Sequence, residues 1–202
     1  LIFRNQLVPI PIFGDVKSIR LGAYGFAANK GAIIFPFEVG ASRFVFMGCH
    51  LTAGSGSENL ESRNQQLRQL MRMVEGSYDY LAITGDLNYR IDLTYEKCLD
   101  FIGQRNIEVL LQNDQLYNMR KRDPNLALLK EPKQTFLPTY KFDPNSDVYD
   151  TSSKHRVPSY TDRILIRRGR KRLAVGNSNE PKYDVTNQPP LNFPSMPVCI
   201  DF

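Results

Sequence analysis

The chain has 202 residues, of which 42% are hydrophobic, which suffices for one domain with a substantial core and argues against disorder. No apolar run approaches the length that would span a bilayer, so we expect no transmembrane segment. A net charge of +5 suits an anionic partner such as a phosphate ester, a nucleic acid or an acidic membrane. Three widely spaced cysteines make neither a metal pattern nor a disulfide framework, and two histidines exclude a histidine-rich metal site.

The first half of the chain alternates between strand and helix patterns. Residues 1–13 predict a buried strand, and residues 22–31 form a Gly-rich segment whose only polar side chains are Asn29 and Lys30. Apolar runs at 31–38 and 43–50 predict a hairpin. Residues 57–76 predict a helix that begins at Ser57 as N-cap, with Arg63 and Asn64 away from its apolar face. A buried strand follows at 80–85.

The second half begins with a helical pattern at 94–116 that breaks at Gly103. Residues 121–133 are polar with two prolines and predict a loop, and 164–166 form an apolar strand. The tail at 176–197 predicts mostly loop, followed by a short strand at 198–202. Neither an internal repeat nor a second domain boundary is visible, so we expect residues 1–202 to form a single layered α/β domain.

Polar side chains follow two of the predicted strands. Asp86 and Asn88 end the strand at 80–85, and His50 ends the strand at 43–50. Two residues apart on an extended chain, Asp86 and Asn88 would point to the same side, and together they could accept from a water and donate to an anion. The alternatives are an Asp-Leu-Asn turn that closes the strand and a structural role for a lone histidine.

A basic stretch near the end of the chain contains a further carboxylate. Residues 154–172 hold eight Lys or Arg and one Asp, Asp162, which either forms an ion pair or orients a catalytic group. Such a stretch is either a solvated basic face or, with Tyr140 and Lys141 before it, a phosphate site. The chemistry that suits these groups is water attack on a phosphate ester, with cations or a metal neutralising the developing charge.

Four blocks of sequence resemble the inositol polyphosphate 5-phosphatase family, part of the wider Mg-dependent endonuclease/exonuclease/phosphatase superfamily. They are Ala-Asn-Lys-Gly-Ala at 28–32, His-Leu-Thr-Ala-Gly at 50–54, Gly-Asp-Leu-Asn-Tyr-Arg at 85–90, and Pro-Ser-Tyr-Thr-Asp-Arg-Ile-Leu at 158–165. The last has Tyr160 and Thr161 where the family has Trp and Cys. The segments 138–143 and 149–152 also match.

The resemblance implies a four-layer α/β sandwich with two packed mixed or antiparallel sheets flanked by helices, and Mg²⁺ as cofactor. In this family Asp86 would orient or activate water, Asn88 would hold water and phosphate, His50 would stabilise the transition state, and Asp162 would orient a catalytic histidine elsewhere. Four residues match positions that grip the neighbouring 4-phosphate, and two further substrate-binding residues complete the expected site. The four are Tyr140, Lys141, Lys154 and Arg156, and the two are Lys30 and Arg90.

Two departures from the family pattern bear on activity. The family's metal-binding Glu belongs to a block before the matched region, and this chain opens on Leu1 rather than Met, so we expect a piece of a longer protein. Residues 193–198 align with the family block that carries an Asp-His pair, and both residues are absent. Loss of a general base costs about 10²–10⁴-fold, and loss of the metal ligand adds to this, so we expect these 202 residues alone to be poorly active or inactive.

The leading hypothesis is therefore Mg-dependent hydrolysis of the 5-phosphate of phosphoinositides or soluble inositol phosphates. The alternatives are a degenerate phosphoinositide-binding scaffold and a related nuclease. The Tyr140–Lys141 and Lys154/Arg156 set weighs against nucleic acid as a partner. We expect a cytoplasmic protein, peripheral at the cytosolic face of membranes.

Overall fold

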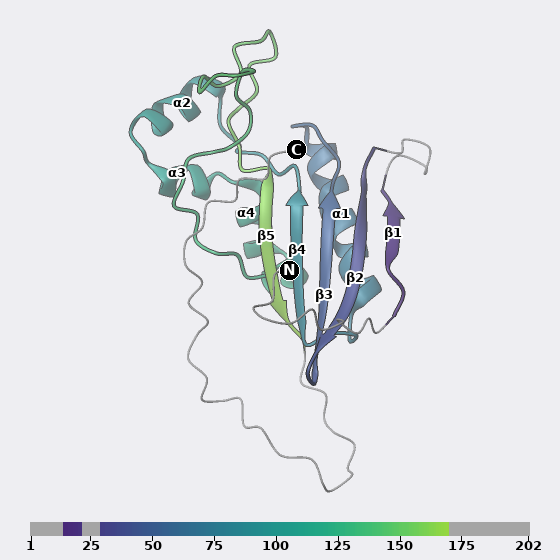
Figure 1. The fold of residues 1–202 in the computed structure, drawn as a ribbon. Coiled ribbons are helices and arrows are strands. Elements are labelled where there is room, and N and C mark those ends of the chain that lie inside the picture. Colours follow the sequence, from purple (N-terminus) through teal and green to yellow (C-terminus); the bar gives the residue numbers. More distant parts are fainter. Residues whose placement is uncertain (1–13, 22–28, 170–202) are drawn as a thin grey trace, which may run out of the picture.

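The computed structural model describes residues 14–21 and 29–169, and its centre is a five-stranded sheet (Figure 1). The strands lie in the order in which they occur in the sequence. Only β3 and β4 pair in parallel, and the other neighbours are antiparallel. The strands are β1 (Lys17–Arg20), β2 (Gly31–Val39), β3 (Ser42–His50), β4 (Tyr80–Asp86) and β5 (Asp162–Arg168).

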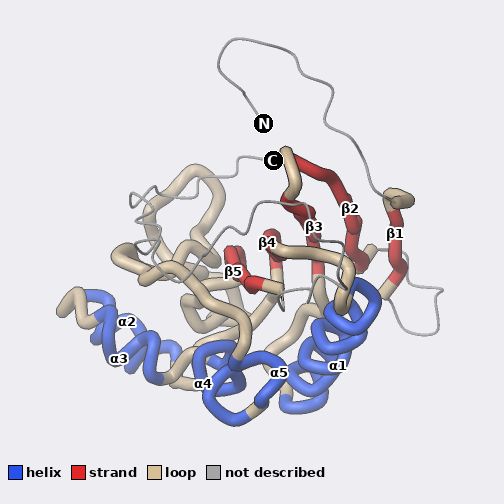
Figure 2. Tube along the Cα trace, turned by 90° about the horizontal axis from the view of Figure 1, so that it is seen from below, coloured by secondary structure: helices blue, strands red, loops and turns tan. Residues whose placement is uncertain are grey.

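The helices gather on one face of this sheet, as the view along the strands shows (Figure 2). They are α1 (Ser57–Val74), α2 (Tyr95–Gly103), α3 (Ile107–Gln112), α4 (Gln115–Arg122) and α5 (Pro124–Ala127). Helix α1 is the crossover that two adjacent parallel strands require, and it joins β3 to β4. Within the described ranges, none of the helices is long and apolar enough to cross a membrane.

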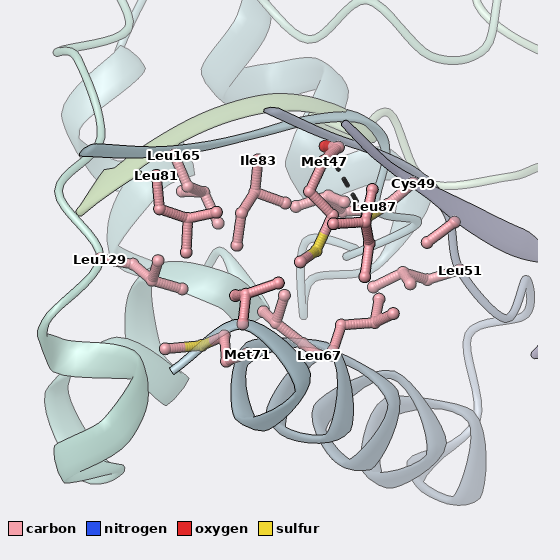
Figure 3. Packing of buried hydrophobic residues seen from close by; sticks show 14 of the residues in the cluster. Met47, Cys49, Leu51, Leu67, Met71, Leu81, Ile83, Leu87, Leu129 and Leu165 are labelled. Carbon is pink, nitrogen blue, oxygen red and sulfur yellow. Dashed lines mark hydrogen bonds between the residues drawn. The ribbon is translucent and has the colours of Figure 1, made fainter. Parts of the chain in front are cut away.

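The core lies between the sheet and α1 (Figure 3). Alternate residues of β3 and β4 point to the same face, and among them Met47, Leu81 and Ile83 are fully buried. They meet Leu67 and Leu70 of α1, which recur at helical spacing. Burying each such side chain stabilises the fold by about 1.5–3 kcal/mol, so this layer fixes where β3 and β4 end.

The opposite face of the sheet is also apolar. Phe37 stacks on Phe44, which stacks on Tyr80, with ring centroids 5.3 and 5.1 Å apart. Farther along this face Ile33 and Phe46 are 57% and 38% exposed. The predicted α/β class is confirmed. Of the two sheets that the family resemblance implies, the described residues contain this one.

The polar face predicted for α1 is wrong at two positions. Arg63 and Asn64 are buried, because they tie the helix to its surroundings rather than facing water. Arg63 donates to the carbonyls of Thr52 and Gly54, and Asn64 accepts from the hydroxyl of Tyr89. The N-cap is Gly56 rather than Ser57, and no side chain caps this end.

The loop predicted at 121–133 is wrong at its start. Helix α4 continues to Arg122, and α5 follows at once, because Asp123 accepts from the Asn125 N–H as N-cap and Pro124 occupies the first turn, where its missing N–H costs nothing. The hairpin and the break at Gly103 are confirmed. The strands predicted at 1–13 and 198–202, the tail, and most of the Gly-rich segment lie outside the described residues.

Candidate active site

The register of the sheet brings three predicted site residues into one row. Opposite one another across β2, β3, β4 and β5 lie Gly31, His50, Asp86 and Asp162. Directly paired residues point to the same side of a sheet. The side chains of His50, Asp86 and Asp162 therefore share one face, at the end of the sheet where β3 and β4 end and β5 begins. We call these three residues the strand-end row.

Direct contacts join part of this row to Lys30, which precedes β2. The Nε2 atom of His50 lies 3.3 Å from Oδ2 of Asp86, and it also contacts Nζ of Lys30. The side chains of His50 and Asp86 are 49% and 33% exposed, so the pair remains open to solvent and to a ligand. The structure therefore places a cation, an imidazole and a carboxylate side by side.

The backbone around Asp86 explains how β4 turns out of the sheet. Gly85 has φ +114°, and a Cβ on it would lie 2.3 Å from the carbonyl oxygen of Cys49, so only glycine permits this close approach. Asn88 has φ +56°, a left-handed conformation that Asn tolerates. Its backbone N–H donates to Oδ1 of Asp86 at 3.0 Å. The predicted turn and the predicted site therefore coincide in the same residues.

This turn corrects the expectation that Asp86 and Asn88 point the same way from an extended strand. Asn88 is buried, and its Nδ2 donates to the carbonyl of Leu51 at 3.1 Å, just beyond the end of β3. The left-handed residue breaks the alternation on which the expectation depended. Asn88 nevertheless lies next to Asp86 through the backbone hydrogen bond.

The environment of Asp86 makes its charge costly. Burial raises the pKa of this carboxyl, and the neighbouring charge of Asp162 raises it further. His50, the Asn88 N–H and Arg90 oppose this shift without cancelling it. A carboxylate with a raised pKa beside a second carboxylate is typical of a functional site, since a purely structural pair would be arranged to attract.

Arg90 connects the strand-end region to the loop that follows α5. Its Nη2 donates to Oδ1 of Asn88 at 2.6 Å, and its guanidinium carbon lies 4.5 Å from the centroid of the Tyr140 ring. Tyr140 pairs with Ser159 through two backbone hydrogen bonds. The loop between α5 and β5 rises beyond the edge of the sheet where β4 ends and β5 begins (Figure 1). This arrangement brings Tyr140 to the site.

The other predicted phosphate-gripping residues lie farther along this loop. Lys154 is exposed. Arg156 donates from Nη1 and from its backbone N–H to Oδ2 of Asp150, at 2.9 and 3.0 Å. Among the described residues, no hydrogen bond or ion pair joins Lys141, Lys154 or Arg156 to the strand-end row.

Two positions that the sequence reasoning gave no role support these site residues. Asp150 anchors Arg156, and hydrogen bonds from Ser152 and Arg156 hold the pKa of Asp150 well below its usual range. The Leu51 carbonyl anchors Asn88. Asp150 lies in a segment that matches the family, and this match could have identified it from the sequence. The role of the Leu51 carbonyl could not be predicted, because every residue has a backbone carbonyl whatever its side chain.

The described residues contain no group of three or more His, Cys, Asp or Glu side chains placed to hold a metal ion. The pair of Asp86 and Asp162 nevertheless suits a magnesium ion, which proteins commonly hold through one or two carboxylates plus water and substrate phosphate. Burial is the larger cause of the raised pKa of Asp86, and the repulsion from Asp162 that adds to it is the interaction that a divalent cation would relieve.

The structure is thus that of an α/β protein with acidic, imidazole and cationic groups at the ends of neighbouring strands. Such a group of side chains is suited to phosphate esters. The family model described as "Endonuclease/Exonuclease/phosphatase family 2" matches residues 13–187. The chain belongs to this family.

Its relatives confirm the resemblance to inositol polyphosphate 5-phosphatases. Inositol-1,4,5-trisphosphate 5-phosphatase 1 of Schizosaccharomyces pombe is 40% identical over 161 residues, which are 76% of this chain and 15% of the relative. Human Synaptojanin-1 is 36% identical over 172 residues, 82% of this chain and 11% of the relative. The chain thus spans a small part of the length of these relatives.

Solved structures agree with this assignment. The inositol polyphosphate 5-phosphatase domain of SPsynaptojanin, in complex with inositol (1,4)-bisphosphate and calcium ion, is 35% identical with a TM-score of 0.67. The match covers 75% of this chain and 46% of that domain. A Cimex nitrophorin, solved as a ferrous NO complex, is 28% identical with a TM-score of 0.61, over 79% of this chain and 54% of its own. The same fold therefore occurs with another ligand chemistry, and the site has to carry the argument about function.

Proposed function

We propose that this protein hydrolyses the 5-phosphate of phosphoinositides or inositol polyphosphates by Mg²⁺-dependent attack of water on a phosphomonoester. The observation that carries the proposal is the strand-end row, with Asn88 and Lys30 beside it, in a chain whose relatives are 5-phosphatases. The row supplies an acceptor for a water proton and donors for phosphate oxygens on one face.

Each group has a role that follows from its chemistry. Asp86 orients the attacking water as a hydrogen-bond acceptor and takes up its proton. The water oxygen bonds to phosphorus as its proton passes to Asp86, and the bond to the inositol oxygen breaks. The inositol oxygen takes a proton from solvent and leaves as a hydroxyl, and Asp86 returns its proton to solvent. His50 and Lys30 donate to phosphate oxygens, and the second N–H of the Asn88 amide is available for the same purpose.

Magnesium, held by Asp86 and Asp162, would supply positive charge to the developing phosphate oxygens when bound. The role proposed for Asp162 in the family resemblance, orientation of a catalytic histidine, concerns a residue outside the described ranges. The aligned end at 193–198, which lacks the Asp-His pair, also lies outside them.

The substrate class follows from the neighbouring phosphate. Removing the 5-phosphate of inositol 1,4,5-trisphosphate leaves inositol (1,4)-bisphosphate, the molecule in the related SPsynaptojanin domain. We propose that Tyr140, Lys141, Lys154 and Arg156 grip the remaining 4-phosphate, with Asp150 holding Arg156 in place. A net charge of +5 would favour an anionic membrane surface, so we propose peripheral association with the cytosolic face of a membrane. The residues assigned to the 4-phosphate favour an inositol phosphate over a nucleic acid, so we propose no nucleic-acid partner.

A second candidate is a domain that binds inositol phosphates without turnover. The absence of Asp and His at 193–198 favours it. The two candidates share the site and differ only in chemistry, so one assay separates them.

The test is phosphate release from phosphatidylinositol 4,5-bisphosphate by the full-length protein, measured with and without Mg²⁺. We expect release that needs Mg²⁺ and falls about 10²–10⁴-fold in Asp86→Asn, which keeps the shape of the side chain and removes its charge. Release no greater than that of the Asp86→Asn variant would sink the hydrolase proposal. Headgroup binding that survives in the same protein would then establish the second candidate.

A further inference from the structure

The sequence reasoning placed Arg90 among the residues that bind substrate, but its surroundings suit another role. Arg90 is only 8% exposed. Its Nη2 donates to Oδ1 of Asn88 at 2.6 Å, and its Nε donates to the Asn88 backbone carbonyl at 3.1 Å. Two in-plane nitrogens of the guanidinium therefore donate to Asn88, while its central carbon lies over the Tyr140 ring.

These contacts fix which way the Asn88 amide points. Its oxygen accepts from Arg90, and its nitrogen donates to the Leu51 carbonyl at 3.1 Å. A reversed amide would set its NH₂ group against the guanidinium donors and its oxygen against a carbonyl, and both contacts would be repulsive. In the observed orientation one N–H is used on Leu51, and the other remains free to donate to an anion.

Backbone hydrogen bonds hold both Arg90 and Tyr140 in place. The Arg90 backbone N–H donates to Oε1 of Gln115 at 3.0 Å. Tyr140 is held to Ser159 by paired backbone hydrogen bonds of 3.2 and 2.7 Å, and the Ser159 hydroxyl accepts from the Ile91 N–H. Arg90 thus lies between two fixed segments, and two of its nitrogens, Nε and Nη2, already donate to Asn88.

We propose that Arg90 is a positioning residue: it sets the orientation of the Asn88 amide, and the Tyr140 ring holds its guanidinium in the plane this requires. The inference rests on the proposed function for its kinetic consequence. Its structural part, the fixed amide, stands independently of activity. Tyr140 thereby serves both the proposed 4-phosphate grip and, through Arg90, the residue that faces the scissile phosphate.

The kinetic test compares Arg90→Lys and Arg90→Met in the full-length protein, with Arg122→Lys on the exposed end of α4 as the matched control. A lysine keeps the charge but loses the planar fork of donors. We expect both Arg90 variants to lower kcat about 10–100-fold with little change in KM, and Arg122→Lys to change neither. A direct phosphate contact would instead raise KM and be rescued in part by lysine, and that result would overturn the proposal.

The structural test does not depend on turnover. The side-chain NH₂ signals of Asn88 in the ¹⁵N-labelled full-length protein are assigned from their loss in Asn88→Asp. We expect them to shift and broaden in Arg90→Lys and, through loss of the stacked ring, in Tyr140→Leu, but not in Arg122→Lys. Unchanged Asn88 signals in Arg90→Lys would overturn the proposal. Changed signals in a protein that releases no phosphate would uphold it and reject the hydrolase function alone.

Discussion

Asp86 is held in an environment that favours its protonated form. Burial and the charge of Asp162 raise its pKa above the ordinary value of 3.8. A carboxyl whose pKa is raised in the fold contributes stability that is present below its unfolded pKa and is lost as pH rises through the folded value. At neutral pH, the charged Asp86 therefore weakens the fold that presents it.

This sign gives a prediction for the Asp86→Asn variant. It should have a higher Tm than the wild type at about pH 7, where the wild-type carboxylate is charged, and the difference should shrink as the pH falls below about 4. Thermal unfolding of the metal-free protein in EDTA, followed by circular dichroism between these pH values, measures it. A lower Tm than the wild type at neutral pH would show that the carboxylate is stabilised rather than strained.

For the individual site residues, the sequence predicted which ones lie close together, but it did not predict the direction of each side chain. The strand ends located His50, Asp86 and Asp162, because strand register alone brings them together. The left-handed turn at Asn88 and its hydrogen bond to Leu51 were not predictable, since they depend on the packing of β3 beside β4. Arg90 was placed in the site because it ends the block at 85–90 that resembles the family, whereas its contact with Tyr140, fifty residues later in the chain, could not be predicted.

Among the elements, β5 is fixed by a buried group of ion pairs just beyond Asp162. Arg163 is 3% exposed and donates to both carboxylate oxygens of Asp114 and to Glu131. Asp114 is also the N-cap of α4, so the same residue begins a helix and anchors the strand that carries Asp162. The sequence could not reveal this link, because the three residues are far apart in the chain.

Removing Arg163 should therefore be costly. Arg163→Met leaves the buried Asp114 carboxylate without its ion-pair partner and leaves Glu131 with Arg120 alone, and we expect the free energy of unfolding to fall by about 3–5 kcal/mol. Arg120→Met serves as the control, because the Arg120 side chain is 20% exposed and makes a single ion pair, at 3.1 Å with Glu131, so its loss should cost less than that of Arg163. Urea unfolding of both variants gives the comparison, and equal losses would contradict the role assigned to Arg163.

For the whole molecule, the sheet face opposite the helices is apolar and partly exposed to solvent. Ile33 and Phe46 are exposed on it, beside a ladder of stacked aromatic rings. The two-sheet sandwich implied by the family resemblance would cover this face with a second sheet. Periodicity predicted the α/β class and the hairpin, but no pattern within one strand identifies the surface that packs against it.

Coverage of this face can be tested with Phe46→Asp in the full-length protein. If a second sheet covers Phe46, the substitution buries an unpaired charge and should lower the free energy of unfolding by about 3 kcal/mol or more. Leu128→Asp is the control, since Leu128 follows α5 on the other side of the sheet and is 48% exposed. Similar small losses for the two variants would mean that the face remains open to water.

The identity of the product decides whether the strand-end row removes a 5-phosphate. Inositol 1,4,5-trisphosphate is incubated with the full-length protein and Mg²⁺, and the reaction is followed by ³¹P nuclear magnetic resonance. If the strand-end row removes the 5-phosphate, we expect inorganic phosphate and inositol 1,4-bisphosphate as the sole products. The reaction with Asp86→Asn should be greatly slowed. Loss of the 1- or 4-phosphate, or an unchanged spectrum, would contradict it.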